Sequence, residues 1–162
     1  MKNYNNEIIE VLNDLIRINR DRISGYEKAV ENLEDGEGTL KTLFYQLSDE
    51  SQKLKEQLSG QVRLLGGEPA EDSTMSGKIY RAWMDVKDAF TADDAKSALE
   101  ACEYGEDAAQ KAYAEAQDDS RDFPENIQRL ISDQKDTLHS SHDLIRAKRD
   151  EYKANAKRTQ LH

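Results

Sequence analysis

The sequence predicts an all-α fold, a bundle of four long helices. Apolar residues recur every three or four positions along four long segments, which is the pattern of helices that bury one face. The only two prolines, Pro69 and Pro124, fall between these segments. The 162 residues are enough for one domain with its own core. We expect this domain to cover residues 1–153, followed by a basic C-terminal tail at residues 154–162 that frays.

The first two predicted helices cover residues 7–33 and 40–65. The residues between them, 35–38, read Asp-Gly-Glu-Gly and tolerate a tight reversal of the chain. Because this connection is short, the two helices should lie antiparallel. The second helix should end at the Gly-Gly-Glu-Pro stretch of residues 66–69.

The last two long helices are predicted at residues 92–117 and from Pro124 to beyond Lys153. A short polar turn at residues 118–123 joins them into a second antiparallel hairpin. Between the two hairpins lies a connection of about 25 residues, in which helical spacing predicts a short helix at residues 75–90. Two hairpins joined by one long crossover form the arrangement of ferritin-like four-helix bundles.

Charge and composition exclude several classes of protein. The net charge of −10 argues against nucleic acid as a partner, since phosphate binding needs a basic face. No stretch approaches the roughly 20 apolar residues of a membrane span. The N-terminus lacks the apolar core of a signal peptide, and the single cysteine, Cys102, cannot form a disulfide framework within one chain. We therefore expect a cytoplasmic protein.

Polar residues interrupt the apolar stripes near the middle of the four helices. An unpaired buried charge is costly, so these residues should have a purpose. The ionisable members are Glu27, Glu50, Glu103, Glu106, His139 and His142. Carboxylates bridge hard cations and imidazoles complete the coordination shell, so these six residues are candidate ligands for iron or manganese in the bundle core. Asn19 and Gln134 are further polar positions on the same faces.

The same residues also fit a second interpretation. They can form a hydrogen-bonded network in the core, or lie at the edges of the apolar stripes with their polar groups in water. The sequence contains no glycine-rich phosphate loop and no evident Ser-His-Asp order. No catalytic residues are therefore assigned, and a non-catalytic role is the main interpretation.

Six short segments of the sequence carry a resemblance to a known family. They are Leu12-Asn13-Asp14-Leu15-Ile16, Gly25-Tyr26-Glu27-Lys28-Ala29, Leu65-Gly66-Gly67-Glu68-Pro69, Arg81-Ala82-Trp83-Met84-Asp85-Val86-Lys87, Cys102-Glu103-Tyr104-Gly105-Glu106-Asp107 and His142-Asp143-Leu144-Ile145-Arg146. Over nearly its whole length the chain resembles uncharacterised bacterial ferritin-like four-helix-bundle proteins, a domain of unknown function. The resemblance implies the fold and a bacterial source, and no established reaction.

Ferritin-like di-iron proteins carry one glutamate on the first and third helices and Glu-x-x-His on the second and fourth. On this pattern Glu27, and Glu103 or Glu106, stand for the single glutamates. The second helix has Lys53 where the pattern has histidine, and the fourth has His139 where it has glutamate. Neither Glu-x-x-His motif is intact.

Two functions follow from the sequence. The first is a non-catalytic or stress-related bundle that works through its acidic surface or as a homo-oligomer, with its physiological partner left open. The second is a ferritin-like protein that binds iron or manganese at an atypical carboxylate and histidine site, with redox or storage chemistry.

Overall fold

The protein is a bundle of four long helices, as the sequence predicts. The computed structural model describes residues 2–33, 38–72 and 95–160. The helices are α1 (Lys2–Asn32), α2 (Gly38–Leu64), α4 (Ala95–Asp119) and α5 (Glu125–Gln160). The short helix predicted at residues 75–90 lies outside the described residues. None of the described helices is long and apolar enough to cross a membrane.

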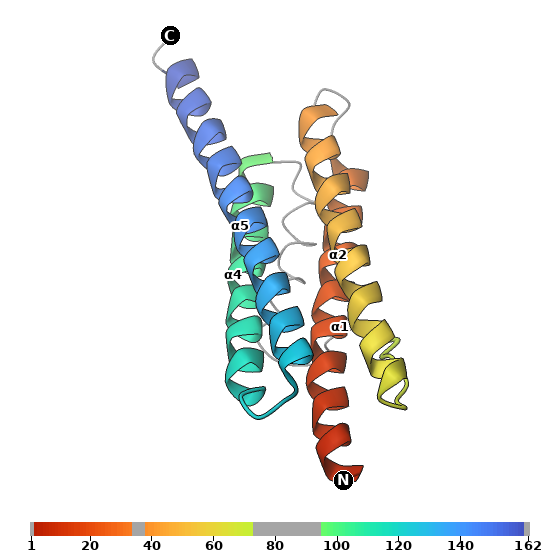
Figure 1. The fold of residues 1–162 in the computed structure, drawn as a ribbon. Coiled ribbons are helices and arrows are strands. Elements are labelled where there is room, and N and C mark those ends of the chain that lie inside the picture. The colour runs from red at the N-terminus through yellow and green to blue at the C-terminus, as the bar shows by residue number, and fades with distance from the viewer. Residues whose placement is uncertain (1, 34–37, 73–94, 161–162) are drawn as a thin grey trace.

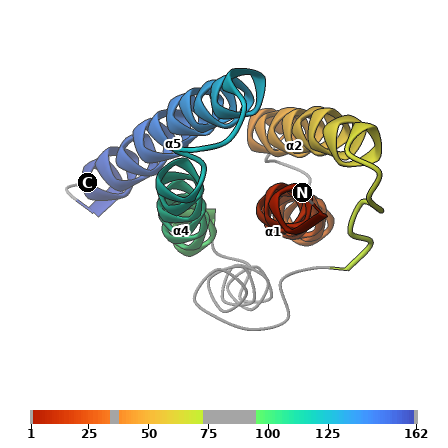
Figure 2. The same ribbon diagram turned by 60° about the horizontal axis from the view of Figure 1, so that its bottom comes forward.

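The four helices form two antiparallel hairpins (Figure 1). Helix α1 packs chiefly against α2, and α4 packs chiefly against α5. The hairpins meet through α1 and α4, while α2 and α5 lie together on the other side of the bundle (Figure 2). Helix α5 extends beyond the other helices at its C-terminal end and remains helical through residues 154–160.

Helix α1 begins at Lys2, five residues earlier than the sequence indicates. Tyr4 explains the longer helix, because it joins α1 to the loop between α4 and α5. The Tyr4 hydroxyl donates a hydrogen bond to the Asp122 carbonyl at 2.6 Å, and its ring meets Phe123 edge-on with centroids 6.2 Å apart. These contacts hold one end of the first hairpin against the second.

Helix α2 ends in a left-handed turn at Gly66, whose φ is +84°. The Gly66 N–H donates to the Arg63 carbonyl and the Gly67 N–H to the Val62 carbonyl, a pattern that satisfies the free carbonyls of the last turn. The chain then returns to α1, where both ends of the Asn13 amide hold it. Asn13 donates to the Glu68 carbonyl at 3.1 Å and accepts from the Ala70 N–H at 2.8 Å.

The apolar core is divided into two clusters, one in each half of the bundle. The cluster in the half of the bundle that contains the N-terminus ends at Ile18 on α1, and the cluster in the other half contains Tyr26. On α4 the boundary between the two clusters falls between Ala109 and Cys102. The residues between the clusters are largely polar on every helix. A polar layer therefore crosses the middle of the bundle, between the two apolar clusters.

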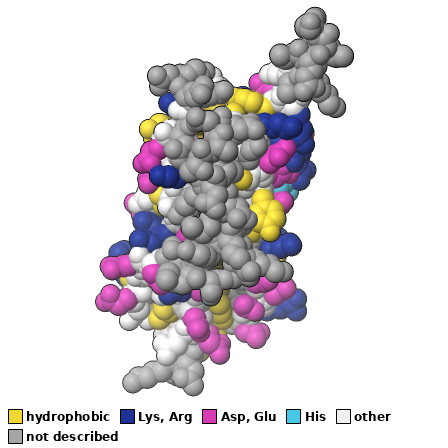
Figure 3. Space-filling view, turned by 180° about the vertical axis from the view of Figure 1, so that it is seen from behind, with side chains coloured by type: hydrophobic (Ala, Val, Ile, Leu, Met, Phe, Trp, Pro, Cys, Tyr) yellow, Lys and Arg dark blue, Asp and Glu magenta, His cyan; other side chains and the backbone are white. Residues whose placement is uncertain are grey.

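Charge on the surface is uneven along the bundle. The last part of the chain, from Arg146 onward, has six basic and two acidic residues, so it carries +4 against −14 for the rest. Figure 3 shows basic side chains gathered beside the C-terminal half of α5, at the upper right, and acidic side chains gathered toward the lower end.

Candidate functional site

The polar layer is the candidate functional site, because it is the place where the core departs from apolar packing. Its buried polar residues come from all four helices. They are Asn19, Asp21, Arg22, Ser48, Ser51, Glu106, Gln134, Ser141 and His142, joined by the hydroxyls of Tyr26 and Tyr113. Buried polar groups of this kind are tolerated when they satisfy one another, and they then fix a unique core arrangement.

Arg22 and Glu106 form an ion pair in the centre of the layer. Both side chains are 0% exposed, and Arg22 Nε lies 2.8 Å from Glu106 Oε1. A second bond runs from Arg22 Nη2 to Glu106 Oε2 at 3.2 Å, so the pair is bidentate. The guanidinium on α1 therefore neutralises the carboxylate on α4 and joins the two hairpins.

Three more residues complete the surroundings of this pair. Tyr26 donates its hydroxyl hydrogen to Glu106 Oε1 at 2.8 Å. Arg22 Nη1 donates to the Ser51 hydroxyl on α2, and Arg22 Nη2 lies 3.6 Å from Glu50 Oε1. Glu50, about a quarter exposed, also accepts a hydrogen bond from Ser141 on α5 at 2.6 Å. All four helices thus contribute to one network around a buried cation.

The electrostatics keep this cation charged. Burial by itself lowers the pKa of Arg22, but the charge of Glu106, its hydrogen bond and the charge of Glu50 outweigh burial, so the net pKa shift is upward. Burial, together with the negative charge of Glu106, raises the pKa of the Tyr26 hydroxyl well above its ordinary value. The same two causes raise the pKa of the buried Cys102 thiol. Tyrosine and cysteine here are neutral, and arginine is the positive charge.

A second hydrogen-bond chain lies next to the ion pair. Asn19 donates to the Tyr113 hydroxyl at 2.9 Å, and Tyr113 donates to Gln134 Oε1 at 2.8 Å. Gln134 then donates to the Leu54 carbonyl and to Gln57 Oε1. This chain connects α1, α4, α5 and α2 in turn. The sequence prediction that Asn19 and Gln134 are polar positions on the buried faces agrees with this arrangement.

The six candidate ligands from the sequence do not converge on one point. Glu106 is in the centre and Glu50 at its edge, but Glu27 is exposed and lies outside the layer. His139 is 65% exposed and lies near Asp143, with 3.6 Å between Nε2 and Oδ2. Tyr26, the neighbour of Glu27, faces the core on α1, so Glu27 points away from it.

Glu103 and His142 lie together, away from the central pair, at the contact between α4 and α5. Asp107 joins them, and one ligand atom from each of the three residues lies within 4.8 Å of the others. Glu103 and Asp107 are one turn apart on α4, and His142 faces them from α5. We call these three residues the seam cluster. They are the group of described residues that can hold a metal ion.

The sequence reasoning missed Arg22 and Asp107. Arg22 lies three residues after Asn19 and four before Tyr26, so its spacing places it on the buried face. Asp107 carried no such signal, since it is 56% exposed and meets His142 only through the packing of two helices.

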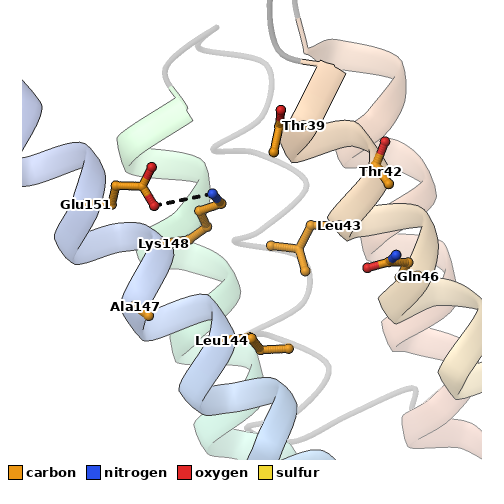
Figure 4. Close-up of a pocket in the computed structure, with 8 residues that line it drawn as sticks. All are labelled: Thr39, Thr42, Leu43, Gln46, Leu144, Ala147, Lys148 and Glu151. Atoms are coloured by element: carbon orange, nitrogen blue, oxygen red, sulfur yellow. Dashed lines mark hydrogen bonds and ion pairs between the residues drawn. The ribbon is translucent and has the colours of Figure 1, made fainter.

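A shallow groove of about 490 Å³ runs between α2 and α5 (Figure 4). Leu43 and Leu144 point toward each other across it, and Lys148 pairs with Glu151 at 3.3 Å on its rim. Its lining contains no histidine, no cysteine and no pair of carboxylates. The groove therefore lacks a set of metal ligands, and its one acid and one base are paired with each other on the rim.

Comparison with known proteins agrees with this fold. The model of a family described as a domain of unknown function, DUF2383, matches residues 7–119, and the chain belongs to this family. A crystal structure of ferritin-like, diiron-carboxylate proteins from Bacillus anthracis str. Ames is similar, with a TM-score of 0.68 and 18% identity. The match covers 94% of this chain and 99% of that one, and at this identity it shows the fold alone. No curated protein matches the chain.

Proposed function

We propose that this member of the DUF2383 family is a non-catalytic ferritin-like bundle that acts through its surface, and that Arg22 supplies the positive charge of its core. The observation that carries this proposal is the bidentate ion pair between Arg22 and Glu106, in which both side chains are fully buried. A protein cation holds the central carboxylate, so Glu106 needs no metal ion to balance its charge.

The residues present do not fit a di-iron centre in the core. Such a centre uses carboxylates and imidazoles that converge from the four helices. Here both oxygens of Glu106 are bonded to Arg22, and one of them also accepts from Tyr26. Lys53 and His139, at the positions where the two Glu-x-x-His motifs are broken, point to solvent. The Arg22 guanidinium lies between Glu106 and Glu50, in the place that a metal ion shared by these carboxylates would take.

Charge balance gives a physical reason for this arrangement. An unpaired buried carboxylate is strongly destabilising, whereas a buried pair with complete hydrogen bonding is tolerated and can specify how helices fit together. Arg22 reaches α4 through Glu106 and α2 through Ser51 and Glu50. The pair therefore acts as a structural link between the two hairpins, and the exposed surface is left as the means of interaction.

The proposal is tested by loading the full-length chain with Fe²⁺ under anaerobic conditions and then admitting oxygen. We expect no pair of iron ions per chain and no oxidation of Fe²⁺ faster than in protein-free buffer. Bound iron is measured by elemental analysis and oxidation by the absorbance of ferric species. The variants Glu106→Gln and His142→Ala distinguish iron bound in the core from iron bound at the seam cluster.

Binding of two irons per chain with rapid oxidation, both abolished by Glu106→Gln, would contradict the proposal. Iron that persists in Glu106→Gln but disappears in His142→Ala belongs to the seam cluster and leaves the proposal for the core intact. The exposed Glu27→Gln variant serves as the matched control, because it removes one carboxylate of α1 outside the polar layer.

A further inference from the structure

The seam cluster presents an imidazole and two carboxylates to one small space between α4 and α5. His142 is 6% exposed, Glu103 is 13% exposed and Asp107 is 56% exposed. One ligand atom from each lies within 4.8 Å of the others. The cluster is open to solvent on the side of Asp107 and closed on the side of His142. An ion could therefore enter from the surface and meet a buried nitrogen.

His142 directs a buried nitrogen into the cluster. Its Nε2 lies 2.6 Å from Asp107 Oδ1 and makes no hydrogen bond of good geometry, while Nδ1 lies 3.5 Å from Asp143 Oδ1. A positive charge shared by Nε2 and the Asp107 carboxylate stabilises so short a contact, and a metal ion bound by both atoms supplies it. A second carboxylate near the other ring nitrogen is a common feature of histidines that bind metals.

Glu103 is oriented by two basic residues of α5. Arg149 donates to Oε2, and Arg146 Nε lies 3.5 Å from Oε1. These contacts fix the carboxylate beside His142, and they also reduce the negative charge of the site. A site of this kind should discriminate against Mg²⁺ and Ca²⁺, which require many oxygen ligands.

We propose that the seam cluster binds one first-row divalent cation, of the Zn²⁺ or Mn²⁺ class, through His142 Nε2, Asp107 and Glu103. One imidazole and two carboxylates form a mixed nitrogen and oxygen donor set that suits these ions. The remaining coordination positions face solvent and are taken by water. The site is separate from the central pair, since Asp107 and Glu106 are neighbours on α4 that face different sides of the helix. It does not depend on the function proposed above.

The test is isothermal titration of the chelator-treated full chain with Zn²⁺ and, separately, with Mn²⁺. We expect one ion per chain for at least one of these metals, and a loss of affinity of about tenfold or more in both His142→Ala and Asp107→Asn. Asp107 is largely exposed, so its variant keeps the fold even if the buried histidine variant does not. Thermal unfolding of each variant in the absence of metal shows whether it keeps the fold.

His139→Ala is the matched control, because it removes a histidine of the same helix that lies outside the cluster and is 65% exposed. It should bind metal as the wild type does. The proposal is overturned if neither metal binds, if Asp107→Asn binds as tightly as the wild type, or if His139→Ala weakens binding as much as His142→Ala. The last result would indicate binding by surface histidines.

Discussion

Arg22 lies on the buried face of α1, three residues after Asn19 and four before Tyr26. A buried arginine is rare unless it is paired, and here it has a bidentate partner in Glu106. Lysine could not replace it, because an ammonium cannot form two parallel bonds to a carboxylate while a further nitrogen bonds Ser51. One side chain thus accounts for a carboxylate that would otherwise suggest a metal centre.

The two buried tyrosines make the free energy of unfolding depend on pH. Burial raises the pKa of Tyr26 and of Tyr113 above the ordinary value of 10.0. Below that pH both residues are protonated in the folded and unfolded chain, so they cause no change. Above it the unfolded chain loses its tyrosine protons first, and the free energy of unfolding falls by about 1.4 kcal/mol per pH unit for each tyrosine until the folded pKa is reached.

Urea unfolding at a series of pH values above about 10 measures this loss of stability. Tyr113→Phe should show a shallower decline than the wild type, since it has one buried tyrosine fewer. Tyr104→Phe is the control, because Tyr104 is largely exposed. Equal slopes in the wild type and Tyr113→Phe would show that the buried hydroxyl does not resist ionisation.

Among the helices, α4 serves two purposes with adjacent residues. Glu106 faces the central layer, whereas Glu103 and Asp107 face α5 and form the seam cluster with His142. Helix geometry explains the separation of Glu106 from Asp107, because adjacent residues point in different directions, whereas Glu103 and Asp107 are four residues apart and share a face. The core network and the proposed metal site can therefore be altered independently.

The end of α2 gives a prediction at the scale of one helix. Gly66 has a positive φ, which an alanine adopts only with strain, so Gly66→Ala should lower the free energy of unfolding by about 1 kcal/mol. Gly60 lies inside α2, and a Cβ there meets nothing within 4 Å. Gly60→Ala should therefore raise stability by about 0.5–1 kcal/mol. Chemical denaturation of both variants measures the two effects.

Opposite signs for these two glycines are the expected result. A Gly66→Ala variant as stable as the wild type would mean that the left-handed turn does not end the helix in solution. A destabilising Gly60→Ala would mean that another part of the protein packs against that face of α2.

For the whole molecule, the helices were predictable because their apolar spacing and the Gly-rich and Pro-containing breaks depend on local sequence. Gly66 and Pro124 mark helix ends in the structure much as the sequence indicates. Glu106 and His142 were also correctly placed on buried faces. Their partners were not predicted, since Arg22 is 84 residues from Glu106 and Asp107 is on another helix from His142. Pairing across helices depends on rotation and register, which periodicity does not determine.

The metal site predicted from the sequence combined residues of two separate places. Glu50 and Glu106 belong to the arginine network, and Glu103 and His142 belong to the seam cluster. The sequence reasoning joined them because all lie near the middle of their helices. The structure distinguishes them by the direction in which each side chain leaves its helix.

The measurement that tests the central claim most directly is a double-mutant cycle on Arg22 and Glu106, with the free energy of unfolding as the readout. Glu106→Gln keeps an acceptor for Tyr26, and Arg22→Met keeps much of the volume of the side chain. Each single substitution leaves one buried charge without its partner and should reduce stability by about 3–5 kcal/mol. The double variant should be more stable than the sum of the two losses predicts, because it removes both charges of the buried pair together. Two losses that simply add would contradict the claim that Arg22 and Glu106 neutralise each other in the core.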